Sequence, residues 1–122
     1  MNATQLTELA VAALEDIKGR DIEVINTSKL SPLFERIIVA SADSTRQVKA
    51  LARSVHDKVR EAGGDVVGIE GEDTGEWVLI DLGSIVVHVM QPAVRSYYNL
   101  EELWKVTPAR GRRKADGDVA GK

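Results

Sequence analysis

The stretch EWVLIDLGSIVVHVM, residues 76–90, decides the fold because its hydrophobic side chains alternate as in a β-hairpin. Gly83 and Ser84 fit a two-residue turn, with glycine at the first central position that a type II′ turn prefers. This turn pairs aliphatic residues across one face of the hairpin: Leu82 with Ile85, Ile80 with Val87, and Val78 with Val89. We therefore predict that this face belongs to the hydrophobic core.

The opposite face of the hairpin is mixed, because it carries Trp77, Asp81 and His88, and it is not an obvious interior. His88 and Asp81 have the composition of a general base with its orienting carboxylate, which would leave Ser84 as the nucleophile. No glycine-rich elbow surrounds Ser84, and a single histidine on a strand is more often a hydrogen-bonded structural residue. Trp77 begins a strand beside the acidic loop GEDTGE, residues 71–76. That place favours a half-exposed aromatic anchor, with a core position as the alternative.

The flanking sequence alternates helical and extended patterns. The predicted elements are a helix over 3–18, strands over 21–26 and 36–41, a helix over 44–62, a strand over 65–70, the hairpin, and a short helix over 92–104. The strand RIIVAS, residues 36–41, is apolar on both sides and should be buried on both faces. Ser44 and Gln47 of STRQ fit a capping box. The order predicts an α/β fold with a single mixed β-sheet flanked by helices, and a right-handed crossover through the second helix.

The composition excludes several kinds of site. The 122 residues fit one compact domain, no cysteine is present, and the two histidines lie 32 positions apart. The acidic loop lacks the spacing of a calcium site. We therefore expect no cofactor and no bound metal. The sequence has neither the features of a signal peptide nor an apolar run that could span a membrane, so a cytoplasmic protein is expected.

Charge is distributed unevenly along the chain. Residues 1–105 contain 11 Lys and Arg against 17 Asp and Glu, a net charge of −6, whereas residues 106–122 contain 5 basic and 2 acidic residues, a net charge of +3. We predict a folded domain over 1–105 and a disordered basic tail over 106–122, which lacks periodicity and large hydrophobic residues. An acidic domain suits a basic protein partner better than a phosphate backbone. The basic face of the helix over 44–62 and RGRRK in the tail leave a peripheral RNA contact open.

Three stretches together resemble the ribosomal silencing factor family, also called Iojap-like. They are RQVKALARSV, residues 46–55, EWVLIDLGSIVVHVM, residues 76–90, and YYNLEELW, residues 97–104. Their order and spacing match the family pattern, and the resemblance extends over residues 3–105. The combination of a W-V-L-x-D-x-G-x-x-V-V-H-V core with a following Y-N-L-E-x-L-W is specific.

The resemblance implies a fold related to the nucleotidyltransferases but without their catalytic aspartates. Gly83-Ser84 is followed here by IVVHV and by no Asp-x-Asp pair, so two-metal chemistry lacks its ligands and no enzymatic activity is expected. The implied function is to bind the large ribosomal subunit through universal ribosomal protein number fourteen. The bound factor would block joining with the small subunit and repress translation when nutrients are short. Self-association of the free protein as a homodimer and peripheral contact with ribosomal RNA are further expectations.

The family motifs also imply a region that contacts the basic ribosomal protein. Its expected members are Trp77, Asp81, His88, Arg95, Tyr98, Asn99 and Leu100. Within this region we expect Trp77 and Tyr98 to be interface anchors rather than core residues, because aromatic side chains dominate the binding energy of protein interfaces.

Overall fold

The computed structural model describes the backbone of residues 1–104 and the side chains of residues 1–102. Its elements are α1 (Ala3–Asp16), β1 (Arg20–Asn26), β2 (Arg36–Ser41), α2 (Thr45–Glu61), β3 (Gly68–Glu70), β4 (Trp77–Asp81), β5 (Ile85–Met90), α3 (Pro92–Tyr98) and α4 (Leu100–Trp104). The predicted basic tail, residues 106–122, and the predicted domain boundary at residue 105 lie outside the described residues.

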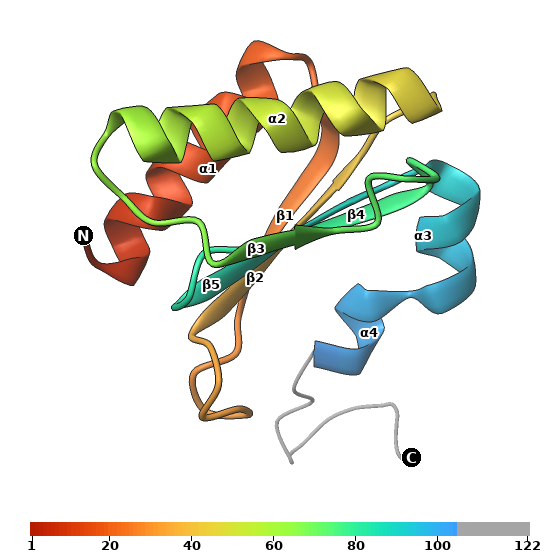
Figure 1. The fold of residues 1–122 in the computed structure, drawn as a ribbon. Helices are drawn as coiled ribbons and strands as arrows, with labels where there is room; N and C mark the ends of the chain where they lie inside the picture. Colours follow the sequence, from red (N-terminus) through yellow and green to blue (C-terminus); the bar gives the residue numbers. More distant parts are fainter. Residues whose placement is uncertain (105–122) are drawn as a thin grey trace.

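The five strands form one mixed sheet in the order β1-β2-β5-β4-β3, which confirms the predicted architecture (Figure 1). β2 and β5 are parallel, whereas the other neighbouring pairs are antiparallel. The connection through α2 joins β2 to β3 at the far edge of the sheet, so it crosses over β5 and β4. β3 is shorter than predicted and begins at Gly68, because residues 65–67 carry the chain from the helix layer back to the sheet.

The hairpin has the register that its alternation predicts. Ile80 is opposite Val87 and Leu79 is opposite His88, so successive residues face opposite sides of the sheet. Gly83 has a φ of 90°, a left-handed conformation that a residue with a side chain rarely adopts. Asp81 supports the turn, since its Oδ1 accepts a hydrogen bond of 2.8 Å from the Gly83 backbone N–H.

α1 and α2 cover one face of the sheet and bury the aliphatic face of the hairpin beneath them (Figure 1). The predicted capping box of α2 forms only in part. Ser44 accepts from the Gln47 backbone N–H at 3.1 Å, but Gln47 Oε1 accepts from the N–H of Asp43 instead of that of Ser44. Gln47 Nε2 also donates to Ile17 O, and this bond ties the start of α2 to the end of α1. None of the helices that the structure describes is long and apolar enough to cross a membrane.

The second face of the sheet is more enclosed than its mixed composition suggests, and this is a correction. β5 is buried over its whole length, including His88 and Met90 on this second face. α3 and α4 lie across this side, and Val94 and Leu100 pack against a second, smaller hydrophobic cluster (Figure 1). The members of that cluster are Ile25, Ile37, Val39, Val86 and Met90. β2 is accordingly buried on both faces, as predicted.

Stability should therefore separate the two faces of β4. Ile80 is fully buried under α1 and α2, so Ile80→Ala should lower the free energy of unfolding by about 2–5 kcal/mol. Leu79→Ala, one residue away on the less enclosed face, should lower it by clearly less. Urea titration of both variants measures the difference. Equal losses would show that the two faces are not packed as the hairpin register requires.

Candidate functional site

A row of aromatic rings runs from the second face of the sheet out to solvent; we call Tyr97, Tyr98, Trp77 and His88 the aromatic row. The indole Nε1–H of Trp77 on β4 donates a hydrogen bond of 3.0 Å to His88 Nδ1 on β5. The Tyr98 ring of α3 packs on Trp77 with 4.9 Å between ring centroids, and Tyr97 meets Tyr98 edge-on at 5.0 Å. Tyr97 and Tyr98 are 82% and 55% exposed, so the outer end of the row is open to solvent.

His88 is the buried end of this row. Burial removes its imidazole from water and lowers its pKa from the usual 6.5 to about 4. The ring is therefore neutral at physiological pH, and its unprotonated Nδ1 is free to accept the Trp77 N–H. Trp77 is in turn half-buried against the second cluster, so it lies between the core position and the exposed anchor that the sequence left as alternatives.

His88 and Asp81 do not form the arrangement of a general base with its orienting carboxylate. Asp81 Oδ1 is occupied by the turn at Gly83, and His88 Nδ1 is occupied by Trp77. No hydrogen bond joins His88 to Asp81 in the part of the chain that the structure describes. Both side chains line the same hollow, but Asp81 supports the turn at Gly83 and His88 binds the Trp77 indole.

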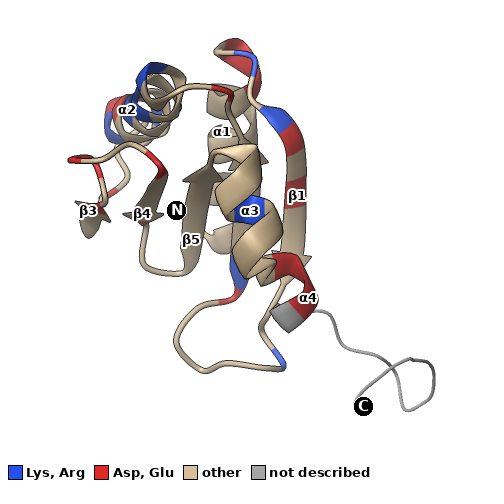
Figure 2. Ribbon diagram, turned by 90° about the vertical axis from the view of Figure 1, so that its right-hand side faces the viewer, with Lys and Arg blue, Asp and Glu red and all other residues tan. Residues whose placement is uncertain are grey.

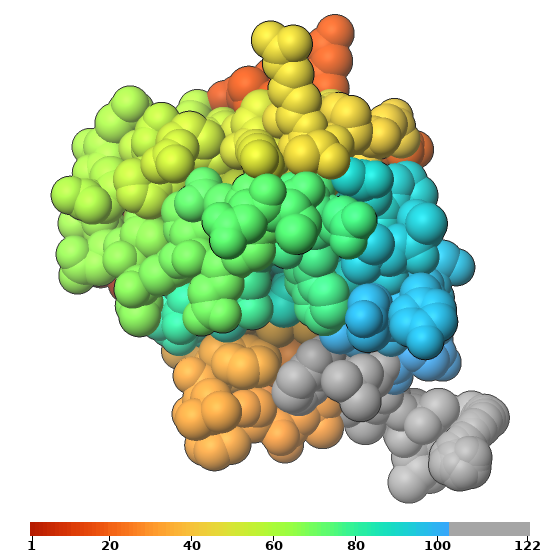
Figure 3. Space-filling model, turned by 45° about the vertical axis from the view of Figure 1, so that its right-hand side comes forward, coloured from red at the N-terminus to blue at the C-terminus, as the bar shows by residue number. Residues whose placement is uncertain are grey.

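A hollow of about 630 Å³ opens on the same face of the sheet, and we call it the docking hollow. Its lining comes from the β1–β2 loop, from β2, β3, β4 and β5, from the turn between β4 and β5, and from α4: Leu33, Phe34, Ile37, Glu70, Leu79, Asp81, Gly83, Val86, His88 and Leu100. Figure 3 shows the loop in orange below the green β3–β4 segment, with α3 and α4 in cyan and blue beside them. The hollow thus combines an apolar lining with carboxylates from Glu70 and Asp81.

Two short helices, α3 and α4, present the outer part of the site; we call residues 92–104 the arm. Asn99 lies between them with φ 49° and ψ 57°, the left-handed conformation that asparagine tolerates better than most residues. This residue redirects the chain, so that Tyr98 contacts Trp77 while Leu100 lines the docking hollow. Arg95, by contrast, points inward and is only 12% exposed.

The structure brings most of the predicted site residues together. Trp77, His88 and Tyr98 form one row, and Asp81, His88 and Leu100 share the docking hollow. Leu33 and Phe34 of the β1–β2 loop were missed, although Leu33 is 78% exposed and lies on the rim. The residues SPLF gave no signal beyond exposed apolar character in a connector. Leu79 could have been found by alternation, since it shares the hairpin face of Trp77 and Asp81.

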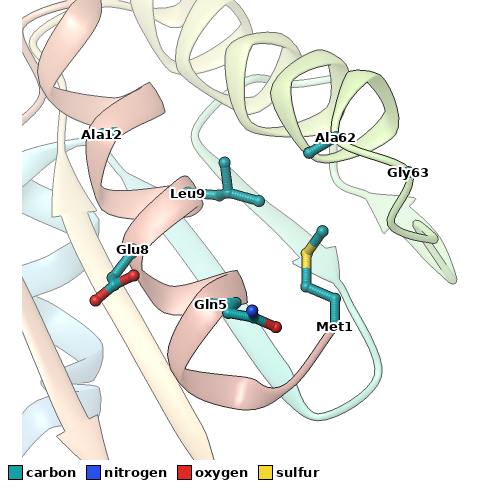
Figure 4. A pocket seen from close by; sticks show the side chains of 7 residues that line it. All are labelled: Met1, Gln5, Glu8, Leu9, Ala12, Ala62 and Gly63. Carbon is teal, nitrogen blue, oxygen red and sulfur yellow. The ribbon is translucent and has the colours of Figure 1, made fainter.

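A second hollow, of about 550 Å³, lies between α1 and the end of α2 (Figure 4). Its lining is Met1, Gln5, Glu8, Leu9, Ala12, Ala62 and Gly63, with Glu8 as the one ionisable side chain in that set. It lies at the helix layer on the other side of the sheet and includes none of the predicted site residues. The docking hollow and the aromatic row are therefore the stronger candidate site.

Comparisons with known proteins agree on one family. The family model described as "Ribosomal silencing factor during starvation" matches residues 1–120. The ribosomal silencing factor RsfS of Chromobacterium violaceum is 61% identical over 104 residues, which is 85% of either chain. A crystal structure of a Chromobacterium violaceum protein superposes with a TM-score of 0.85 at 54% identity and covers 98% of both chains.

A more distant relative extends the comparison to an organelle. The mouse protein named "Mitochondrial assembly of ribosomal large subunit protein 1" is 31% identical over 100 residues, 80% of this chain and 44% of that longer protein. The family model, the close bacterial relative and the matching fold lead to one conclusion: this chain belongs to the RsfS family of ribosomal silencing factors.

Proposed function

We propose that this ribosomal silencing factor docks on the large ribosomal subunit, through universal ribosomal protein number fourteen, and blocks its joining with the small subunit. The observation that carries the proposal is the surface formed by the aromatic row and the docking hollow. It exposes Tyr97 and Tyr98 at the outer end of the aromatic row and Leu33 at the apolar docking hollow, and exposed apolar patches of this kind often mark a binding site. Translation in the cytoplasm would fall when the factor is bound, which fits the family's link with starvation.

The chemistry of the surface suits a basic protein with apolar side chains. Tyrosine and tryptophan supply large contact areas at little conformational cost and dominate interface energies. Glu70 and Asp81 place negative charge beside the apolar lining, so a partner with Lys or Arg near its contact residues would be steered and held in register. The name of the mouse relative refers to the large subunit, which supports the choice of subunit.

The proposed mechanism is occlusion and requires no bond making. His88 and Asp81 both have local structural partners, and the sequence after Gly83-Ser84 lacks the paired aspartates that two-metal phosphoryl transfer needs. A factor bound at the face where the subunits join excludes the other subunit by steric overlap. It has to remain bound for as long as joining is to be blocked. Self-association of the free chain over the same surface would compete with docking, so binding is best measured across a range of protein concentrations.

Subunit joining tests the proposal directly. Purified large and small subunits should associate less when this protein is added, because its bound volume excludes the small subunit. Sucrose-gradient sedimentation measures the joined fraction, and immunoblotting of the gradient should find the protein with the large subunit only. Unchanged joining at saturating protein would contradict the proposal. Co-sedimentation with the small subunit would show that the protein binds the other subunit.

Tyr98→Ala tests the aromatic row as an anchor. Since Tyr98 is more than half exposed, its truncation should change the free energy of unfolding little. Its loss from an interface should cost binding about 2–4 kcal/mol, or about 30- to 1,000-fold in Kd. Ile17→Ala, at an exposed apolar residue near the end of α1, is the matched control and should bind normally. Equal affinities of the two variants for large subunits would move the docking surface elsewhere.

The buried imidazole of His88 predicts a pH dependence of stability. Its pKa is about 4 in the folded protein and 6.5 in the unfolded chain, so the unfolded chain takes up the proton first as pH falls. The free energy of unfolding is therefore unaffected by protonation of His88 above pH 6.5. It falls progressively between pH 6.5 and 4, by about 2 kcal/mol at pH 5. His88→Gln keeps an acceptor for Trp77 but cannot titrate. Urea unfolding at pH 7 and pH 5 should therefore show a steeper loss for the wild type, and equal losses would contradict the assignment.

A further inference from the structure

The Arg95 guanidinium binds groups within the protein and is not exposed for contact with a partner. Its Nε–H donates to Glu101 Oε2 of α4 at 2.9 Å, and its Nη1–H donates to Ser41 Oγ at the end of β2 at 2.8 Å. Nη2 lies 3.8 Å from Glu23 Oε1 of β1. Figure 2 shows blue on α3 between red bands on β1 and α4. One guanidinium therefore joins the arm to two strands of the sheet.

Glu101 depends on this contact more than an ordinary surface carboxylate would. Its side chain is 15% exposed, and its Oε1 is buried with no hydrogen-bond partner among the described residues. Arg95 is thus the cation that compensates a carboxylate largely removed from water. Breaking such a pair from one side leaves a buried charge without compensation, which is far more costly than losing a surface ion pair.

α3 is weakly attached to the sheet. α3 has no buried residue, and its apolar contacts with the sheet include Val94, which is half-buried, and the tilted packing of Tyr98 on Trp77. Asn99, in its left-handed conformation, joins α3 to α4 at a single residue. Among the described side chains of α4, Leu100 packs against the second cluster and Glu101 pairs with Arg95, so the direction of α4 depends on these two contacts.

From this geometry we infer that Arg95 is a positioning residue: it latches α4 against the sheet through Glu101 and so shapes the docking surface, without touching the partner itself. The inference rests on the proposed function for its consequence in binding. With the latch closed, Tyr98 lies on Trp77 and Leu100 lines the docking hollow before any partner arrives. A surface held ready in this way saves the ordering cost of binding.

Arg95→Met tests the latch in the free protein. The unpaired Glu101 carboxylate should draw α4 toward solvent, because water is then its best environment. Hydrogen exchange at the Asn99 and Glu102 amides, which donate within the arm at 2.8 and 3.1 Å, should become faster, while α2 and β5 stay protected. An unchanged exchange rate in the arm would overturn the latch.

Binding by Arg95→Met should weaken in step with the opening of the arm. If the arm is closed in about a tenth of the molecules, the apparent Kd for large subunits rises about tenfold. Arg95→Lys keeps the charge but loses the fork that reaches Glu101 and Ser41 together, so it should fall between the wild type and Arg95→Met. It also serves as the variant to measure if Arg95→Met folds poorly.

The double variant Arg95→Met with Glu101→Met separates positioning from direct contact. Replacing both members removes the buried charge and leaves an apolar pair, so the arm should close again and binding should recover most of the loss. If Arg95 instead contacted the partner, the double variant would bind as weakly as Arg95→Met alone. That result would overturn the inference.

Arg53→Met is the matched control. Arg53 on α2 pairs with Glu72 at 3.2 Å, but this exposed pair joins α2 to the loop before β4 and does not hold α4, so neither exchange in the arm nor binding should change. If the wild-type chain does not bind large subunits, the proposed function is contradicted. The exchange rates of the free variants would still decide whether Arg95 latches the arm, so the two failures are distinguishable.

Discussion

β5 is buried on both faces along its whole length, and the rest of the fold follows from that constraint. A strand at the centre of the sheet, parallel to β2 and antiparallel to β4, needs a hydrophobic layer on each side. α1 and α2 provide one thick layer over the aliphatic half of the hairpin. The opposite layer has to come from the β1–β2 loop and from the short helices after β5.

That second layer is thin and leaves part of the sheet face uncovered, and the candidate site lies there. The arm contributes Val94 and Leu100 to the smaller cluster but leaves the docking hollow beside them. The hollow therefore borders the second hydrophobic cluster and is lined by apolar side chains that the short helices leave uncovered. A partner that fills it would complete the burial that the chain begins.

Polar groups around this surface act mainly as its framework. His88 holds the Trp77 indole, Asp81 holds the turn at Gly83, and Arg95 lies between Glu101 and Ser41. Each has a partner within the chain, while exposed large side chains nearby include Tyr97, Tyr98 and Leu33. In the proposed complex, apolar and aromatic contacts would supply the affinity, and the polar groups beneath them would hold the surface in shape.

Local pattern determined the hairpin register, the amphipathic helix α2 and the family, because alternation, helical spacing and motif spacing are properties of neighbouring residues. The tertiary structure alone decided that the mixed face is largely enclosed, that the loop residues Leu33 and Phe34 border the site, and that Arg95 faces inward. The kinship with nucleotidyltransferases stays a prediction. Arg95 and Ser41 are 54 positions apart in the chain, and no local pattern specifies which distant groups will meet. Those contacts depend on how the arm folds back over the sheet, which is settled by packing rather than by spacing.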